Sequence, residues 1–346
     1  MEPLRIGLVG YGSAGRGIHS RLARETGQQV VAVVTRHRGD EVEHDWPGAR
    51  VVPDVAALLG LDLDLVVVAS PTGDHAEHVR AALEAGVPVL VDKPLATTRV
   101  QAAALVRLAQ ETGGRLTVFQ NRRWDPEQLT LRALLAQGEL GRVHRFERRW
   151  ERFRPQPQHR WKEEDPVAGG LLLDLGAHLV DSAVQLFGPV RRVHAELRAI
   201  TTPALDDVFL ALEHAPDPDG HHVVSHLWAG GLVGAPGPRT RVLGDRGAYL
   251  VTSFEGEPTP FAVLDDAQED YRRPGEPVHE GWLVRGAERT PVPRAPGGHA
   301  DLYRAVQTWL REGGPVPVDP ADAVATARVL DAARVAAETG VPQLLG

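Results

Sequence analysis

Two groups of side chains in this sequence have residue types and spacings suited to acid–base chemistry. Asp174, His178 and Asp181 are separated by four and three residues, so a helix through this stretch places all three on one face. Lys93 follows the apolar run VPVLV, where a buried ammonium group needs a polar or anionic partner. A histidine titrates near neutral pH, and an ammonium group can stabilise a developing alkoxide. Both groups are therefore candidates for proton transfer at a hydroxyl or carbonyl group.

The helical group also has a plainer structural interpretation. Asp174 is a suitable N-cap for the helix that follows, and His178 can be a buried histidine whose hydrogen bonds are satisfied. A metal site needs more ligands than one Asp–His pair offers, so none is expected. The chain has no cysteine, which excludes disulfides, thiolate zinc sites and a cysteine nucleophile.

The N-terminal stretch predicts a nucleotide-binding turn. Residues 4–15 read LRIGLVGYGSAG, an apolar strand that ends in the spacing G-x-G-x-x-G, and a helical segment and a second apolar strand, QVVAVVT, follow. In such a turn Gly10 permits the tight bend, Gly12 lets the backbone approach a pyrophosphate, and Gly15 lets the helix pack closely. A turn that needs only positive φ is the alternative for an isolated glycine triplet. The βαβ context favours the dinucleotide-binding fingerprint.

The end of the second strand bears on which dinucleotide is bound. An NAD-binding protein places a carboxylate there, about twenty residues past the fingerprint, to bind the ribose hydroxyls. This chain has Thr35 and Arg36 instead, and a guanidinium group can pair with a 2′-phosphate. We therefore predict NADP. A solvated basic loop is the alternative, and NAD is the alternative cofactor because a bent loop could bring in Asp40.

Two further strand ends carry polar residues toward the same predicted edge. The fourth strand ends in SPTGDH, residues 70–75, and the fifth ends in DKP, residues 92–94. Open α/β sheets bind ligands at the carboxyl ends of their strands, so both segments are expected at the cofactor site. A lysine at the end of a buried strand is a poor structural choice without an anionic or polar partner, which favours a functional Lys93.

The pattern of apolar runs predicts an N-terminal α/β domain. Strands alternate with helices, and the run at 66–69 is apolar on both faces, as in a strand buried between helix layers. The first domain, residues 1–121, is therefore expected to be a doubly wound parallel sheet of the Rossmann type. Strands are predicted at 5–10, 29–35, 50–53, 64–70, 88–92 and 116–121, and helices at 14–25, 74–85 and 98–112.

After Asn121 the pattern changes to strands that few helices interrupt. This favours an α+β domain with a large, mainly antiparallel open sheet over residues 122–346. A chain of 346 residues also exceeds what one hydrophobic core usually supports. Residues 255–298 are rich in Pro, Gly and acidic residues, so we expect loops and short strands there. Other strands are predicted at 143–153, 190–200, 208–213, 222–228, 240–243 and 248–253, and helices at 126–137, 300–311 and 321–338, besides the helix with His178.

Composition and charge limit the class of protein. A net charge of -8 argues against a general nucleic-acid surface, because phosphate binding requires concentrated Lys and Arg. No apolar run approaches the length of a membrane span, and the N-terminus lacks the pattern of a secretory signal. We expect a cytoplasmic protein with no nucleic-acid or membrane partner.

Several of these motifs together resemble the Gfo/Idh/MocA oxidoreductases. The resemblance rests on GYGSAG, SPTGDH, VDKP and QNRRWDP, the last at residues 120–126. It implies that Lys93 lies beside a nicotinamide and the substrate, and that Asp174 and His178 are the family's catalytic Asp-x-x-x-His. In alcohol oxidation His178 would then accept the hydroxyl proton, Asp174 would orient its ring or bind a hydroxyl, and Lys93 would stabilise the alkoxide. The family usually has Glu-Lys-Pro where this chain has Asp92, an acid shared by members similar to NADP-dependent scyllo-inositol dehydrogenases.

The resemblance implies an NADP-dependent dehydrogenase or reductase that transfers a hydride between the nicotinamide and a hydroxyl or carbonyl carbon of a cyclic polyol or sugar. It also implies a homodimer or homotetramer that associates through the C-terminal sheet. The alternative is a cofactor-sensing binding protein without turnover, which would need no acid–base residues. In the loop before the catalytic helix, Arg160, Trp161 and Lys162 offer donors and an aromatic face to a polar ring or the cofactor. The expected cofactor contacts are Gly10, Tyr11, Gly12, Ser13, Ala14, Gly15, Thr35, Arg36, Ser70, Pro71, Thr72, His75, Asp92, Lys93, Pro94, Asn121, Arg122 and Trp161, and the expected substrate contacts are Lys93, Trp124, Arg160, Asp174 and His178.

Overall fold

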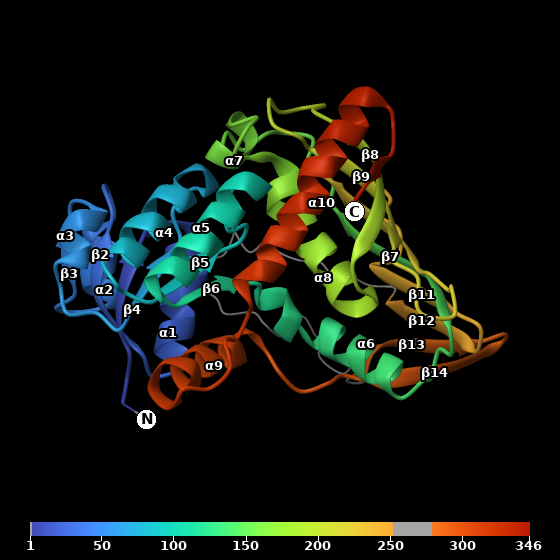
Figure 1. Ribbon diagram of the computed structural model, residues 1–346, viewed down its shortest axis with the longest axis horizontal. Coiled ribbons are helices and arrows are strands. Elements are labelled where there is room, and N and C mark those ends of the chain that lie inside the picture. The colour runs from blue at the N-terminus through green and yellow to red at the C-terminus, as the bar shows by residue number, and fades with distance from the viewer. Residues whose placement is uncertain (1, 252–278) are drawn as a thin grey trace. The chain divides into compact units, whose positions relative to one another are not determined.

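The chain folds into two compact units (Figure 1). The computed structural model describes residues 2–251 and 279–346. Among these, residues 2–121 and 298–324 form the first unit, and residues 122–251, 279–297 and 325–346 form the second. The change of character expected after Asn121 coincides with a unit boundary. The expected second domain, 122–346, differs from the second unit because residues 298–324 belong to the first.

The helix α9 (His299–Glu312) explains this difference. It packs against α1 (Arg21–Glu25), and two of its buried residues bond to the first unit. The hydroxyl of Tyr303 lies 2.8 Å from Nδ1 of His19, and Gln307 accepts a hydrogen bond of 3.1 Å from Gln28. A helix that buries its apolar face and its polar groups on a sheet layer belongs to that layer, wherever it stands in the sequence.

The first unit is built on a six-stranded parallel sheet in the order β3-β2-β1-β4-β5-β6. The strand β4 (Leu65–Val68) is buried along its whole length, as expected between two layers of helices. The doubly wound fold is thus confirmed, with the strand order reversing between β1 and β4. The other strands are β1 (Arg5–Val9), β2 (Gln29–Val34), β3 (Arg50–Val52), β5 (Val89–Asp92) and β6 (Leu116–Phe119).

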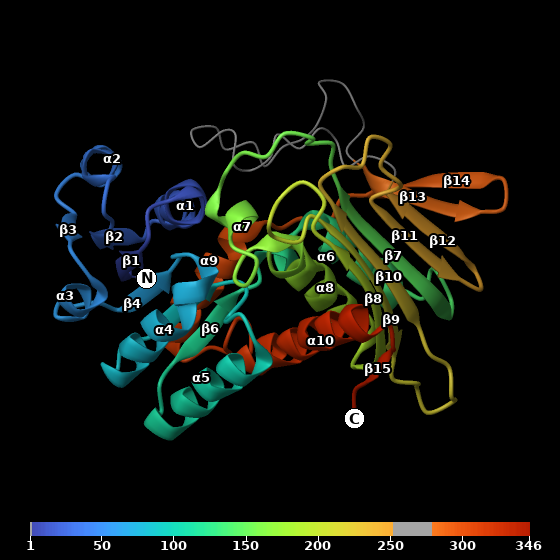
Figure 2. The ribbon, with the colours of Figure 1, turned by 90° about the horizontal axis from the view of Figure 1, so that it is seen from above.

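Helices cover both faces of this sheet (Figure 2). The pair α4 (His75–Glu84) and α5 (Arg99–Thr112) lies on one face, and α1 and α9 lie on the other, as right-handed crossovers require. The helix predicted at 14–25 is present, but residues Gly15–Ser20 form a wider π-type turn ahead of α1. Two short helices that the sequence pattern did not predict are α2 (Gly39–Asp45) and α3 (Val55–Leu59).

The carboxyl ends of these parallel strands lie at one edge of the sheet. Gly10 follows β1 directly, and its N–H donates to the carbonyl of Val34, the last residue of β2, at 3.0 Å. Lys93 follows β5 directly, while Ser70 and Asn121 lie two residues beyond β4 and β6. The segments singled out from the sequence therefore stand at the edge where open α/β sheets bind ligands.

The second unit is built on a nine-stranded sheet in the order β14-β13-β12-β11-β7-β10-β9-β8-β15. Its pairs are antiparallel except β7 with β10, so the mainly antiparallel sheet is confirmed. Of the segment expected to form loops and short strands, residues 255–278 lie outside the described residues, and residues 279–293 form β13 and β14. The strands are β7 (Val143–Glu151), β8 (Val190–Arg198), β9 (Asp207–His214), β10 (Val224–Gly230), β11 (Thr240–Gly244), β12 (Gly247–Val251), β13 (His279–Arg285), β14 (Glu288–Pro293) and β15 (Gln343–Leu344).

One face of this sheet carries the longer helices of the unit (Figure 2). They are α6 (Pro126–Ala136), α8 (Ala177–Phe187) and the part of α10 (Pro320–Thr339) that begins at Ala325. Leu179, Val180 and Ala183 of α8 are buried in one cluster with Phe146 of β7 and Leu227 of β10. This core fixes α8, and with it His178, on the sheet.

The helix that carries His178 begins earlier than the sequence predicts. A π-type turn, Leu172–Gly176, precedes α8, and Leu171 before it already has helical φ and ψ angles. Asp174 therefore lies inside the helical stretch and is not its N-cap, which removes the capping explanation for this residue. π-type turns inside helices often occur at functional sites.

Candidate active site

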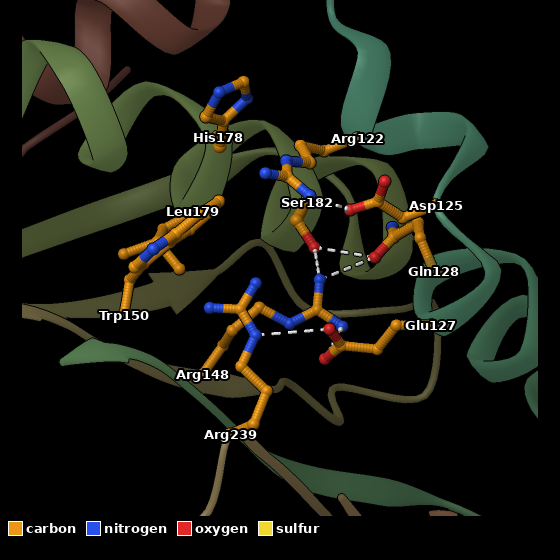
Figure 3. Close-up of a pocket in the computed structure, with 10 residues that line it drawn as sticks. All are labelled: Arg122, Asp125, Glu127, Gln128, Arg148, Trp150, His178, Leu179, Ser182 and Arg239. Atoms are coloured by element: carbon orange, nitrogen blue, oxygen red, sulfur yellow. Dashed lines mark hydrogen bonds and ion pairs between the residues drawn. The ribbon is translucent and has the colours of Figure 1, made fainter. Parts of the chain in front are cut away.

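The position of His178 is set by two contacts between α8 and β7. The imidazole stacks on Trp150, with ring centroids 5.9 Å apart and 24° between the planes (Figure 3). Arg148 lies two residues before Trp150 and bonds the hydroxyl of Ser182, four residues after His178. Two residues along a strand and four residues along a helix both span about 6–7 Å. The spacing of Arg148 and Trp150 along β7 is therefore the same as the spacing of Ser182 and His178 along α8. The strand thus fixes both the rotation and the height of the helix at His178.

Arg148 is the centre of a buried polar network. Its side chain donates to Gln128 at 2.7 Å and to Thr240 at 2.9 Å, and it forms an ion pair with Glu127 at 3.2 Å. Burial raises the pKa of Glu127, but the charges of Arg148 and Arg239 and the Thr240 hydroxyl outweigh burial, so the pKa is lowered overall. Glu127 is therefore held as a carboxylate that neutralises the buried guanidinium.

Removing the Arg148 charge should destabilise the whole fold. We expect Arg148→Met to lower the free energy of unfolding by about 3–5 kcal/mol, because it removes one of the two guanidinium partners of the buried Glu127 carboxylate. Urea unfolding followed by circular dichroism measures the change. The control is Arg145→Met on the exposed face of the same strand, which should change stability by less than about 0.5 kcal/mol. Equal stability of the two variants would contradict a structural role for the network.

Trp150 also contacts two guanidinium groups. The Cζ atoms of Arg239 and Arg122 lie 4.4 Å and 4.7 Å from the centre of the indole ring, and Arg122 forms an ion pair with Asp125 at 2.9 Å. A small pocket opens here beside His178 (Figure 3). It is lined by Arg122, Asp125, Glu127, Gln128, Arg148, Trp150, His178, Leu179, Ser182 and Arg239.

Asp174 and Asp181, predicted on the face of His178, have different surroundings. Asp174 accepts a hydrogen bond of 2.6 Å from Nζ of Lys162. Asp181 is buried, and Arg123 donates to both of its oxygens, Nε to Oδ2 at 2.9 Å and Nη2 to Oδ1 at 2.5 Å. Asp181 therefore acts as a structural anion. Asp174 is only partly buried.

Of the other expected contacts, Arg160 and Trp161 lie in the loop before the helix that carries His178, and Trp124 lies in a different segment. Arg160 bonds Glu163 at 2.6 Å at the start of α7 (Trp161–Glu164), and Trp161 is exposed. Trp124 ends a short 3₁₀ turn, Asn121–Trp124. Arg160 is thus engaged within its own loop.

A second acid near Glu127 makes stability depend on pH. Burial, and then the negative charge of Glu127, raise the pKa of Glu280 to about 7, although Arg294 opposes the shift from 3.4 Å. A carboxyl group whose pKa is higher in the folded than in the unfolded protein stabilises the fold at a pH below the unfolded-state pKa. This stabilisation is lost as the pH rises through the folded-state pKa.

We therefore expect Glu280 to lower the unfolding free energy by about 2–3 kcal/mol as pH rises from 4.5 to about 7. Glu280→Gln should remove this pH dependence and be the more stable protein at pH 8. Urea melts at several pH values measure both. A variant that keeps the wild-type slope over this range would show that another group titrates.

The glycine turn of the first unit has the geometry that each glycine was expected to supply. Gly10 has a φ of 93°, which favours glycine. A Cβ on Gly15 would lie 2.0 Å from the carbonyl oxygen of Gly10, so only glycine lets the helix approach the turn. At Gly12 a Cβ would meet no atom of the described residues within 4 Å, which is compatible with the close approach of a phosphate group.

Lys93 stands in a tightly connected turn. It is half-buried, its N–H donates to Oδ1 of Asp92 at 2.8 Å, and its bond to Pro94 is cis. The ring nitrogens of His75 lie 2.8 Å from the carbonyl oxygen of Pro94 and 2.9 Å from that of Ser70. His75 is buried and links the turns after β4 and β5, and its contact with the cofactor stays a prediction.

The side chain of Tyr11, another predicted cofactor contact, is held by hydrogen bonds within the first unit. It is buried, and its hydroxyl donates a hydrogen bond of 2.8 Å to Asp45. The same carboxylate accepts a hydrogen bond of 2.7 Å from Arg16. Burial raises the pKa of Tyr11, the hydrogen bond with Ser20 lowers it, and the Asp45 carboxylate raises it again. The pKa is raised overall to about 12. The ring of Tyr11 therefore ties the glycine turn to α2.

Sequence reasoning missed a buried chain of polar groups behind Lys93. Nε2 of His19 lies 4.0 Å from Oδ2 of Asp92, and its Nδ1 lies 2.8 Å from the Tyr303 hydroxyl. Burial lowers the pKa of His19 to about 4, although Asp92 opposes the shift, so the ring is neutral. No local pattern links residues so far apart, and Trp150 and Arg148 were missed for the same reason.

The comparisons with known proteins agree with this arrangement. The profile described as an oxidoreductase family with an NAD-binding Rossmann fold matches residues 4–120, and the GFO/IDH/MocA C-terminal domain matches residues 128–250. The Escherichia coli oxidoreductase YdgJ, itself uncharacterized, is 35% identical over 344 residues, 95% of each chain. The chain belongs to the Gfo/Idh/MocA family of oxidoreductases.

A curated relative and a solved structure, both from Bacillus subtilis, are similar over nearly the whole chain. The scyllo-inositol 2-dehydrogenase (NADP(+)) IolW is 29% identical over 340 residues, 96% of this chain and 93% of that protein. The solved structure of yvaA gives a TM-score of 0.87 at 29% identity and covers 100% of this chain and 99% of the other. Within the described residues, no helix is long and apolar enough to cross a membrane, and no three His, Asp or Glu side chains are grouped to hold a metal ion.

Proposed function

We propose that this oxidoreductase uses NADP to transfer a hydride between the nicotinamide and a hydroxyl or carbonyl carbon of a cyclic polyol or sugar. The observation that carries the proposal is the placement of His178, whose ring is stacked on Trp150 while its helix is fixed by Arg148. A protein that only senses a cofactor has no need to position an imidazole so closely. The relation to IolW, a scyllo-inositol 2-dehydrogenase, supports a polyol substrate.

His178 is the acid–base residue of this proposal. Its Nδ1 is buried, so Nε2 is the nitrogen that a substrate hydroxyl would meet. In oxidation the neutral imidazole accepts the hydroxyl proton, and in reduction the imidazolium returns it. Lys93 stabilises the negative charge that develops on the oxygen, and Asp174 binds a hydroxyl group. When bound, the nicotinamide supplies or accepts the hydride.

NADP is the proposed cofactor because no carboxylate stands at the end of β2. The exposed Arg36 lies two residues past Val34, the strand end that bonds Gly10 of the glycine turn. An exposed guanidinium beside this turn is suited to a ribose 2′-phosphate. IolW, at 29% identity, is itself described as an NADP(+) enzyme.

Arg36→Ala should lower catalytic efficiency with NADP by about 10- to 150-fold and leave that with NAD nearly unchanged. The reason is that a charge-assisted hydrogen bond to the 2′-phosphate exists only with NADP. Steady-state kinetics with both cofactors measure kcat/KM. An equal loss with NADP and NAD would show that Arg36 does not contact the 2′-phosphate.

The function itself is tested by the absorbance of NADPH. Wild-type protein is screened with inositols, pentoses and aldoses, each with NADP and with NAD, and the reverse reaction with the corresponding carbonyl products. We expect reduction of NADP by at least one cyclic polyol or sugar. Tight NADPH binding without turnover of any of them would instead favour the sensor alternative.

We further propose that a second copy of the chain covers the face of the nine-stranded sheet opposite the helices. Phe209, His226 and Trp228 form an aromatic cluster there, with Phe209 and Trp228 rings 5.2 Å apart, and the guanidinium of Arg149 lies 3.9 Å from the Trp228 ring. These side chains are only partly buried within one chain. Such a face is suited to a partner surface with the same aromatic residues.

Trp228→Asp should therefore shift the protein from a dimer or tetramer toward the monomer. The introduced carboxylate would have to be desolvated in the interface. Light scattering coupled to size-exclusion chromatography measures the mass, and Arg142→Asp, on an exposed turn, is the control. A wild-type protein that is already monomeric at micromolar concentration would contradict the proposal.

A further inference from the structure

His19 is a buried histidine of the first unit that the function proposed above does not use. It is 1% exposed and lies in the π-type turn Gly15–Ser20, which follows the glycine turn. Its Nδ1 lies 2.8 Å from the hydroxyl of Tyr303, but its Nε2 is buried and forms no hydrogen bond with any described residue. A buried polar atom without a hydrogen bond destabilises a fold, so the presence of a histidine here requires a reason.

Packing alone does not supply that reason. The imidazole lies against Phe119 at the end of β6, with ring centroids 4.4 Å apart, and Phe119 in turn meets the ring of Tyr303 on α9 edge to face. An apolar side chain of similar size would fill this space without leaving a polar atom unpaired. The group that distinguishes a histidine here is Nε2, and it lies 4.0 Å from Oδ2 of Asp92.

The charge of Asp92 determines which nitrogen of His19 carries the proton. Burial lowers the pKa of His19 to about 4, although Asp92 opposes the shift, so the ring is neutral and has one proton. Burial, and then the charge of Asp92, raise the pKa of Tyr303, so its hydroxyl keeps its proton. A proton on Nδ1 would turn the lone pair of Nε2 toward the carboxylate, which is repulsive. We therefore expect Tyr303 to donate to Nδ1 and the Nε2–H to face Asp92.

Asp92 connects this histidine to the turn that carries Lys93. Its Oδ1 accepts the backbone N–H of Lys93 at 2.8 Å, while its Oδ2 lies on the side of His19. The Asp92 side chain is 17% exposed, so its carboxylate can turn toward solvent unless a group inside the fold attracts it. An N–H dipole in a site shielded from water attracts a carboxylate strongly. A dipole that holds Oδ2 therefore also keeps Oδ1 on the Lys93 N–H.

We infer that His19 is a positioning residue for Lys93. Tyr303 fixes the tautomer of His19, the Nε2–H of His19 attracts the Asp92 carboxylate, and Asp92 holds the backbone of the turn. The inference rests on the proposed function, because it is Lys93 that stabilises the charge on the reacting oxygen there. It adds that α9, far from Lys93 in the sequence, helps to keep the lysine in place from inside the first unit.

Hydrogen exchange at the Lys93 amide, measured by NMR, tests the inference without a substrate. The double variant His19→Leu, Tyr303→Phe replaces both partners of the buried hydrogen bond with apolar side chains of similar size. We expect the Lys93 N–H of this variant to exchange at least about 10-fold faster than in wild type, because the carboxylate is free to leave it. The midpoint of urea unfolding should not fall, since no polar atom is left unpaired in place of the two.

Two results of the exchange experiment would overturn the inference. One is wild-type exchange at Lys93 in the double variant. The other is faster exchange throughout the first unit together with a lower urea midpoint, which would make His19 a structural residue. Long-range ¹H–¹⁵N NMR of the His19 ring, assigned by its loss in the double variant, gives the tautomer. We expect the proton on Nε2, and a proton on Nδ1 would equally overturn the inference.

Turnover should be lost separately from cofactor binding. For the polyol found in the NADP screen, we expect the double variant to lower kcat by about 10- to 100-fold and to keep KM and the Kd for NADPH within about threefold of wild type. His19→Gln keeps a side-chain N–H that can face Asp92, so it should restore kcat to within about fivefold of wild type. Wild-type kcat in the double variant would overturn the inference, and so would His19→Gln that is no more active than the double variant.

The matched control is a second buried histidine that is bonded to a hydroxyl. His214 of the second unit is buried, and its Nε2 lies 2.7 Å from the hydroxyl of Ser225. The double variant His214→Leu, Ser225→Ala should keep kcat and the exchange rate at Lys93 close to wild type. An equal loss of kcat in this control would show a general effect of removing a buried histidine and would overturn the inference.

The outcomes separate this inference from the proposed function. If wild type oxidises no polyol or sugar, the proposed function is contradicted, and the exchange rate at Lys93 and the tautomer of His19 still decide whether His19 holds the turn. If wild type is active but the double variant keeps both wild-type kcat and wild-type exchange at Lys93, the proposed function stands and the role of His19 is refuted.

Discussion

Replacing His178 with alanine should lower kcat for polyol oxidation by about 10²–10⁴, the usual contribution of a positioned acid–base residue. The stacked contact with Trp150 and the Arg148–Ser182 bond hold the imidazole in one place, so no other group can take its position without moving the helix. Oxidation needs the neutral ring and reduction the protonated ring. The wild-type kcat/KM should therefore rise with pH for oxidation and fall with pH for reduction.

The pH–rate profile in both directions distinguishes this role from a structural one. In His178→Ala the inflection should disappear together with the rate, while His144→Ala, on the exposed side of β7, should keep both. An inflection that survives in His178→Ala with most of its rate would place the base elsewhere, with Lys93 the next candidate.

Replacing Lys93 with methionine should remove turnover by about 10²–10³ and leave NADPH binding largely intact. The substitution removes the ammonium but keeps the backbone N–H that donates to Asp92, and it keeps the Pro94 carbonyl that His75 holds. The turn should therefore retain its shape. Lys93 also lies after β5, not in the glycine turn that faces the dinucleotide phosphates.

Two measurements separate the effects of Lys93→Met. Fluorescence titration gives the Kd for NADPH, which should stay within a few-fold of wild type, and steady-state kinetics give kcat. A loss of NADPH binding that parallels the loss of turnover would make Lys93 a cofactor ligand only. Wild-type turnover in the variant would remove it from the chemistry altogether.

The fold was predictable where the signal is local. β1, the glycine turn and β4 could be placed because apolar runs and glycine spacing report burial and backbone conformation directly. The short helices α2 and α3 were not predicted because five to seven residues carry too little periodicity. The sequence also did not show that α9 belongs to the first unit, because the buried contacts of Tyr303 and Gln307 join residues almost three hundred positions apart.

The candidate site was predictable only in part. Asp174 and His178 could be paired because helical spacing puts residues four apart on one face. The spacing could not separate Asp174 from Asp181, since only the structure shows that Arg123 engages both oxygens of Asp181. Trp150, which stacks on His178, lies on β7, and the sequence pattern does not show which helix packs against that strand.

Transfer of deuterium from carbon to the nicotinamide tests the central claim most directly. The polyol found in the screen is prepared with deuterium on its ring carbons and incubated with NADP and the wild-type protein, and the NADPH formed is analysed by mass spectrometry and NMR. We predict one deuterium at C4 of the nicotinamide, a primary isotope effect on kcat/KM, and formation of the labelled NADPH that is slower by about 10²–10⁴ with His178→Ala. NADPH without deuterium, or no NADPH from any polyol or sugar tested, would contradict the account.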